Sequence, residues 1–109
     1  MVLTADYNCA HFVSDAWLQE TGQVIDHLMR GFLAPAAERV VTPNLANSMV
    51  RLERPRSPCI VLFRRRVGSP HVGMFVRGRV FHLTDSGPIR QALDIAQVGY
   101  YKTRFYAPR

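Results

Sequence analysis

The sequence has little cysteine and no long apolar run. Only two cysteines, Cys9 and Cys59, occur among its 109 residues, which excludes the multiple disulfides that hold small secreted domains together. The segment from Met1 to Asn8 is short, mixed and uncharged at its start, so we expect no signal peptide. No apolar run reaches the ~20 residues that cross a bilayer. We therefore expect a chain made in the cytoplasm, with no membrane partner and with reduced thiols rather than a Cys9–Cys59 disulfide.

Lysine is almost absent. The sequence has thirteen arginines, one lysine and eight acidic residues, so the net charge is +6 and the pI about 10.2. Arginine suits fixed contacts with carboxylate or phosphate groups. On charge alone, nucleic acid, an anionic membrane and an anionic cell-wall polymer are candidate partners. No helix-turn-helix, zinc-finger or RNA-recognition motif accompanies the charge, which argues against a nucleic-acid binder.

The stretch from Tyr7 to Gly22 predicts the first helix. Asn8 is a favourable N-cap, and Gly22 is a favourable residue just past the helix end. Apolar residues recur at helical spacing along one face: Cys9, Phe12, Val13, Ala16 and Trp17. Polar residues fall largely on the other face: Ser14, Asp15, Gln19 and Glu20. We expect this amphipathic helix to pack its apolar face against the core.

Two more helices and then a set of strands are predicted. Helical spacing runs from Val24 to Leu33, and Thr42-Pro43 begins a third helix that continues to Leu52. A Pro-rich segment at residues 54–58 then separates the helices from the strands. Strands are predicted over 59–63, 71–77, 79–83 and 100–107, with a loop at 84–88 and a short strand leading into a helical turn over 89–97. The order predicts a single α+β domain over residues 1–109, with N-terminal helices packed on a C-terminal antiparallel sheet.

Three side chains could supply a nucleophile, a base and an orienting group. The cap places Cys9 in the first helical turn, where free N–H groups and the helix dipole favour the thiolate. His71 begins a predicted strand, and His82 lies on the next strand across a tight turn at Gly78, so both imidazoles reach one region. We expect Cys9, on a helix packed against this sheet, to face His71. Each residue also has a plain structural interpretation, because buried cysteine and histidine are common in cores. Cys59, inside an apolar run, is expected to be core.

Four motifs follow one another along the chain. They are Asn8-Cys-Ala-His-Phe-Val13, His71-Val-Gly-Met-Phe-Val-Arg-Gly78, Arg79-Val-Phe-His82 and Tyr100-Tyr-Lys-Thr-Arg-Phe-Tyr106. Together they resemble the NlpC-type papain-like cell-wall peptidases, over almost the whole chain. The resemblance implies a papain-like fold, with Cys9 as nucleophile, His71 as general base and His82 as orienting residue. It also implies hydrolysis of peptide bonds in peptidoglycan stem peptides.

The surroundings of Cys9 depart from the family pattern. Family members often have Asp before the cysteine and Ser-Gly after it, where this chain has Asn8, Ala10 and His11. The family's oxyanion Tyr usually lies further upstream, so Tyr7 would take that part beside the Cys9 backbone N–H. Asn8 and His11 are further candidates for substrate contact. The small form is similar to versions encoded in phage tail-gene clusters, which implies phage tail proteins as partners and a virion or tail location.

Other functions stay open. One is a non-catalytic tail-assembly or wall-docking module with the same fold, and another is a basic nucleic-acid binder. A thiol acyltransferase is a third, because the N-C-A-H-F stretch also resembles the N-C-E-H-F signature of lecithin retinol acyltransferase-like proteins, whose histidine precedes the cysteine. Cys9, His11, His71 and His82 could in principle bind zinc. Their spacing fits no compact finger, so we expect neither a metal nor a cofactor.

Overall fold

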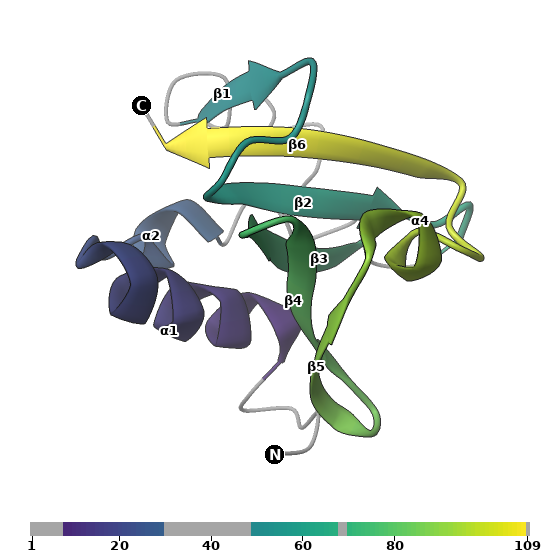
Figure 1. Cartoon of the computed structure of the whole chain (residues 1–109), viewed down its shortest axis with the longest axis horizontal. Coiled ribbons are helices and arrows are strands. Elements are labelled where there is room, and N and C mark those ends of the chain that lie inside the picture. The colour runs from purple at the N-terminus through teal and green to yellow at the C-terminus, as the bar shows by residue number, and fades with distance from the viewer. Residues whose placement is uncertain (1–7, 30–48, 68–69, 109) are drawn as a thin grey trace.

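The computed structural model describes residues 8–29, 49–67 and 70–108. Within these ranges, six strands form one antiparallel sheet in the order β1-β6-β2-β3-β4-β5 (Figure 1). In chain order the elements are α1 (Cys9–Thr21), α2 (Asp26–Met29), β1 (Met49–Leu52), β2 (Cys59–Arg64), β3 (His71–Val76), β4 (Arg79–Thr84), β5 (Gly87–Gln91), α4 (Leu93–Ala96) and β6 (Lys102–Pro108). A helix packed on an antiparallel sheet confirms the α+β class. No helix in the described ranges is long and apolar enough to cross a membrane.

Helix α1 begins and ends where the sequence predicts. The Asn8 side chain accepts hydrogen bonds from the backbone N–H groups of Ala10 and His11, at 3.0 and 3.3 Å. Gly22 adopts a φ of 76°, the left-handed conformation that ends a helix at little cost for glycine. The prediction that Ser14 lies on the solvent side is wrong, because this residue is only 6% exposed. The buried face of α1 therefore includes Ser14 in addition to the apolar residues.

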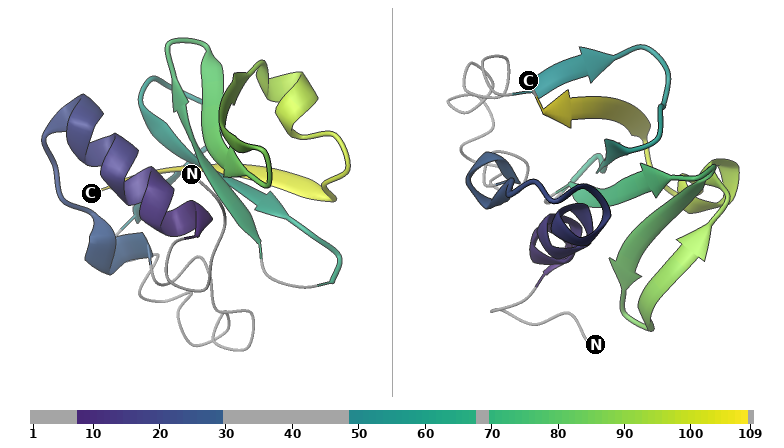
Figure 2. Two further views of the ribbon diagram at one scale, coloured as in Figure 1. Left: turned by 90° about the horizontal axis from the view of Figure 1, so that it is seen from below. Right: turned by 60° about the vertical axis from the view of Figure 1, so that its left-hand side comes forward.

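Apolar side chains cover both faces of the sheet. On one face, called the α1 face, lie helices α1 and α2 (Figure 2). They pack against the strands through Trp17, Ile25, Met29, Leu62, Val72 and Met74, among others. On the other, called the α4 face, a smaller cluster contains Val61, Phe63, Val80 and Ala96, with Phe75, Leu93, Tyr100 and Phe105 packed against it. Strand β2 supplies side chains to both clusters, which explains its continuous apolar sequence.

The end of the third predicted helix is wrong, because residues 49–52 form β1. This strand pairs with β6, from Met49 opposite Pro108 to Leu52 opposite Phe105. Pairing with the distant C-terminal strand overrides the helical spacing of the local sequence. A strand therefore precedes the Pro-rich segment as well as following it. The parts of the second and third predicted helices within residues 30–48 lie outside the described residues.

The remaining strands follow the sequence closely. Strands β2, β3 and β4 begin at Cys59, His71 and Arg79, as predicted. The predicted loop at 84–88 shortens to a two-residue turn, because β5 already begins at Gly87 and pairs with Thr84. Strand β5 leads into α4 within residues 89–97, as expected, and β6 begins two residues later than predicted. The sheet that carries the two histidines is thus the best-predicted part of the fold.

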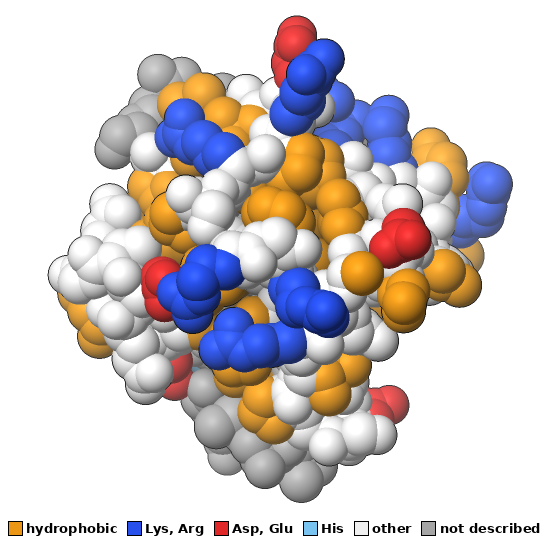
Figure 3. Space-filling model, in the orientation of Figure 1, with side chains coloured by type: hydrophobic (Ala, Val, Ile, Leu, Met, Phe, Trp, Pro, Cys, Tyr) orange, Lys and Arg blue, Asp and Glu red, His pale blue; other side chains and the backbone are white. Residues whose placement is uncertain are grey.

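Arginine side chains are exposed on several elements. They include Arg51, Arg65, Arg66, Arg79 and Arg90, and Figure 3 shows Lys and Arg side chains among hydrophobic ones, with fewer acidic neighbours, on one face. Arg77 in the β3–β4 turn forms an ion pair with Glu20 of α1. This pair joins the C-terminal half of α1 to the hairpin. Because both side chains reach solvent, we expect it to contribute less than about 1 kcal/mol.

Candidate active site

A tight hairpin brings His71 and His82 together. The turn between β3 and β4 is made by Arg77 and Gly78, both with positive φ (50° and 81°), which matches the twist of a short hairpin. The strand register then places the start of β3 beside the end of β4. Nε2 of His71 lies 2.8 Å from Nδ1 of His82, in a buried hydrogen bond. The predicted proximity of the two imidazoles is confirmed.

The close approach of His82 depends on a glycine in the facing strand. A Cβ atom on Gly73 would lie 3.1 Å from Cβ of His82 and 3.0 Å from Cγ1 of Val80. Both distances are tighter than ordinary van der Waals contact, so a side chain here would push the β4 side chains away. Sequence reasoning gave Gly73 no role of its own. The structure shows that this glycine leaves room for His82 to reach His71.

His82 makes a second polar contact through its other ring nitrogen. Nε2 of His82 lies 2.8 Å from Oε1 of Gln91, the last residue of β5. Gln91 lies opposite Val80, on the same face of the sheet as His82. Gln91, His82 and His71 therefore form one hydrogen-bonded chain. Sequence reasoning missed Gln91, because only the register between β4 and β5 brings it beside His82.

Aromatic rings enclose His71. Phe63, its cross-strand partner on β2, stacks on the imidazole with ring centroids 5.7 Å apart. The Tyr100 ring lies almost parallel to the imidazole, at an angle of 6° and a centroid distance of 5.9 Å. The guanidinium carbon of Arg65 lies 5.6 Å from the centroid of the Tyr100 ring. These neighbours were not predicted from the sequence, and they hold His71 in a slot that is closed to most solvent.

Burial keeps both imidazoles neutral at neutral pH. Burial, followed by the charges of His82 and Arg65, lowers the pKa of His71 from its usual 6.5 to about 4. Burial also lowers the pKa of His82, although its hydrogen bond to Gln91 acts in the opposite direction. A neutral imidazole has a lone pair that can accept a proton, as a general base must. The pair is therefore in a form suited to proton abstraction at pH 7.

Cys9 lies in the first turn of α1 as predicted, but the expected low pKa of its thiol is wrong. Burial is the largest influence and raises the pKa of the Cys9 thiol, because the residue is 8% exposed and a thiolate loses its hydration there. The backbone N–H groups of Val72, Ala10 and Cys9 face the sulfur, and together with the charge of Arg65 they act to lower this pKa. Their combined effect does not offset burial, so the resting group is a thiol.

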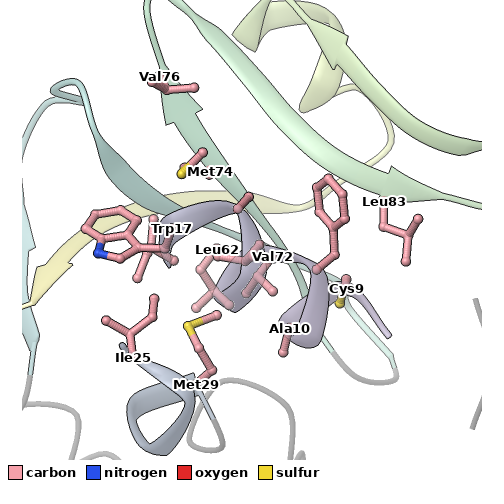
Figure 4. Packing of buried hydrophobic residues seen from close by; sticks show 14 of the residues in the cluster. Cys9, Ala10, Trp17, Ile25, Met29, Leu62, Val72, Met74, Val76 and Leu83 are labelled. Carbon is pink, nitrogen blue, oxygen red and sulfur yellow. The ribbon is translucent and has the colours of Figure 1, made fainter. Parts of the chain in front are cut away.

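Cys9 was expected to face His71, but the structure places the thiol and the imidazoles on different faces of the sheet, near the same end. Alternation along β3 directs His71 to the α4 face, whereas Cys9 and Val72 belong to the cluster on the α1 face (Figure 4). In the described residues no hydrogen bond joins the thiol to either imidazole. The N–H of Val72 that faces the sulfur belongs to the peptide bond between His71 and Val72. The charge of Arg65 also acts on both Cys9 and His71, so the sulfur lies at the start of β3.

The other predicted site residues form the helix cap or lie outside the described ranges. Oδ1 of Asn8 lies 3.0 Å from Nδ1 of His11, and the exposed His11 completes the capping box of α1. Tyr7, the predicted oxyanion donor, is outside the described residues.

Cys59 is fully buried, which confirms its core position. Within the described ranges, no three His, Cys, Asp or Glu side chains are grouped to hold a metal ion.

A cavity of about 420 Å³ lies beside the β1–β6 pair. Its lining residues are Arg51, Leu52, Glu53, Thr103, Arg104 and Phe105, none of which was predicted as a site residue. The Nε atom of Arg104, one of these residues, is buried without a hydrogen-bond partner. Comparison of the chain with protein-family models, with curated proteins and with solved structures finds no match. A functional interpretation therefore rests on the sequence motifs and on the geometry around His71.

Proposed function

We propose that this protein is a cysteine peptidase or amidase with a papain-like, NlpC-type fold, and that it hydrolyses amide bonds in peptidoglycan stem peptides. The observation that carries the proposal is the buried His71–His82 hydrogen bond at the start of β3, where the next backbone N–H faces the sulfur of Cys9. A nucleophile, a base and an orienting group are the components that thiol-dependent acyl transfer requires. The motif resemblance supports the choice of a stem-peptide substrate.

The reaction would proceed through a thioester on Cys9. The sulfur attacks the carbonyl carbon of the scissile amide while His71 takes the thiol proton, and the carbonyl π electrons move to the oxygen. The backbone N–H of Cys9, with Tyr7 as the second proposed donor, stabilises this oxyanion. When the C–N bond breaks, His71 returns the proton to the leaving amine. Water activated by His71 then cleaves the thioester, releasing the carboxylic acid and restoring the thiol.

The two reacting groups would begin as a neutral pair. Burial raises the pKa of the Cys9 thiol and lowers the pKa of His71, so a resting thiolate–imidazolium pair is disfavoured. Proton transfer to His71 would therefore accompany attack on the substrate. The hydrogen bond between Nε2 of His71 and Nδ1 of His82 would hold the His71 imidazole in place during this transfer.

Mass spectrometry of purified stem peptides after incubation with the protein tests the proposal. We expect the wild type to release two fragments, one ending in a new carboxylate and one beginning with a new amine. Cys9→Ala serves as the inactive control, and Cys59→Ala controls for the loss of a buried thiol elsewhere. If wild-type protein that is folded by circular dichroism releases no fragment from any stem peptide or from intact peptidoglycan, the proposal is wrong.

A non-catalytic wall-docking or phage tail-assembly module is the second candidate, and the burial of the reacting groups favours it. Cys9 and His71 are 8% and 7% exposed, so little of either is open to a substrate. The exposed arginines would give such a module salt-dependent binding to an anionic wall polymer. Sedimentation with purified cell walls at low and high salt measures this binding. Salt-sensitive binding by wild-type protein that releases no fragments would favour the module.

A further inference from the structure

The hydrogen bonds that link Gln91, His82 and His71 bear on which ring nitrogen of His71 carries a proton. We propose that Gln91 is a positioning residue that fixes the protonation pattern of both histidines, leaving Nδ1 of His71 as the bare nitrogen. The part that Gln91 would play in catalysis rests on the proposed function. The protonation pattern itself is a property of the folded chain and can be measured without a substrate.

The pattern follows from what each atom can donate or accept. The amide oxygen of Gln91 only accepts hydrogen bonds, so Nε2 of His82, 2.8 Å away, must carry a proton. A neutral imidazole carries one proton, which leaves Nδ1 of His82 as an acceptor. Nε2 of His71, 2.8 Å from that acceptor, must then carry the proton of His71. Nδ1 of His71 keeps its lone pair and is the nitrogen that can take a proton from a thiol.

Exchanging the positions of the oxygen and the NH₂ group of the Gln91 side chain would reverse the direction of both hydrogen bonds. If Gln91 presented its NH₂ group to His82, Nε2 of His82 would become the acceptor and Nδ1 would carry the proton. His82 would then donate to Nε2 of His71. The proton of His71 would move to Nδ1, which could no longer accept one. The orientation of a side chain on β5 therefore decides whether His71 can act as a base.

A neutral acceptor suits this position better than a carboxylate would. Glutamate at position 91 could also accept from His82, but its negative charge would favour the protonated form of that ring. A protonated His82 donates from both nitrogens, which would force Nε2 of His71 to become the acceptor. The other charged or titratable groups around His71 include Arg65, whose charge disfavours protonation, Tyr100, which stacks on the ring, and the thiol of Cys9 at the start of β3. Glutamine provides the acceptor without adding a charge.

NMR of the full chain with ¹⁵N-labelled histidine tests the proposal, because a protonated ring nitrogen and a bare one differ widely in chemical shift. At pH 7 we expect His71 and His82 each to carry the proton on Nε2. Gln91→Met removes the acceptor and should shift the ratio of the two protonation patterns by roughly tenfold, the worth of one hydrogen bond. Gln23→Met is the matched control, since Oε1 of Gln23 accepts from Trp17 at 3.0 Å, outside the chain of rings. It should leave the pattern unchanged.

A wild-type spectrum with the proton of His71 on Nδ1 would overturn the proposal, as would an unchanged pattern in folded Gln91→Met. Gln91→Glu supplies an independent readout: it should keep the wild-type pattern at high pH and raise the pKa of His82, so that the pattern reverses at higher pH than in the wild type. Where hydrolysis is observed, Gln91→Met should lower kcat by about tenfold and leave KM nearly unchanged. If the pattern is as expected and the wild type cleaves nothing, the proposed function fails and the role of Gln91 in the protonation pattern stands.

Discussion

Two buried thiols lie at opposite ends of the sheet, and their surroundings differ. Cys59 begins β2 and is fully buried, and burial raises the pKa of its thiol despite the backbone and charge of Arg56. Cys9 lies by the start of β3, beside the other end of β2, and burial raises its thiol pKa as well. Only at the Cys9 end does a neutral, hydrogen-bonded imidazole pair lie nearby. Burial therefore does not distinguish the two thiols, and the imidazole pair near Cys9 is the difference on which the proposed reactivity of Cys9 depends.

The largest effect is expected from removing the two thiols separately. Cys9→Ala should lower stem-peptide hydrolysis by roughly 10⁴-fold or more, because no other group can form the thioester. Cys59→Ala should retain hydrolysis while losing about 1 kcal/mol of stability through a small cavity. Fragment release is measured by mass spectrometry, and folding by circular dichroism. Wild-type cleavage by folded Cys9→Ala would show that the nucleophile lies elsewhere.

The imidazole pair at the Cys9 end can be weakened in two steps. His71→Ala should lower hydrolysis by about 10²- to 10⁴-fold, since attack then lacks its base and the leaving amine lacks its acid. His82→Asn should cost only about tenfold, because an amide oxygen can still accept from Nε2 of His71, whereas His82→Ala leaves that N–H unpaired and should cost more. The hydrolysis rates of His71→Ala, His82→Asn and His82→Ala on one stem peptide test this order of effects. Equal inactivity of His82→Asn and Cys9→Ala would remove the orienting role from His82.

Acid should destabilise the His71 end of the sheet. The unfolded chain binds a proton at His71 near pH 6.5 and the folded chain only near pH 4, so the unfolded state binds more protons between these values. Stability is thus fully retained above about pH 6.5 and falls as pH drops towards 4, by about 3 kcal/mol from this group. Urea unfolding at pH 7 and pH 4 measures the loss. In His71→Gln the loss should be smaller by that amount, and an equal loss in both proteins would contradict the shifted pKa.

A smaller effect is expected from filling the space beside His82. Gly73→Ala should reduce stability by about 1 to 3 kcal/mol, because the new Cβ would press on Val80 and His82. It should also lengthen the hydrogen bond between His71 and His82, and so lower hydrolysis. Urea unfolding and the ring ¹⁵N spectrum of the variant measure the two effects. An unchanged spectrum would show that the hairpin accommodates the methyl group without moving His82.

The features that the sequence predicts correctly are those that depend on local contacts. Asn8 and Gly22 set the ends of α1 through contacts within a few residues, and the turn at Gly78 aligns two adjacent strands, so local signals were sufficient there. Strand β1 was mistaken for a helix because its partner β6 lies more than fifty residues away in the sequence. The contact between Gln91 and His82 and the raised pKa of the Cys9 thiol likewise depend on tertiary packing. Local reasoning identified the helix dipole at Cys9 but could not weigh it against burial.

Alkylation of the two thiols tests the pairing of Cys9 with His71 most directly. Wild-type protein and His71→Ala are treated with iodoacetamide over a range of pH, and the labelling rate of each cysteine is read by peptide mass spectrometry. If His71 acts as its base, Cys9 is predicted to react faster than Cys59 in the wild type and to lose this advantage in His71→Ala. Faster labelling of Cys59 in the wild type, or an unchanged Cys9 rate in folded His71→Ala, would contradict the account.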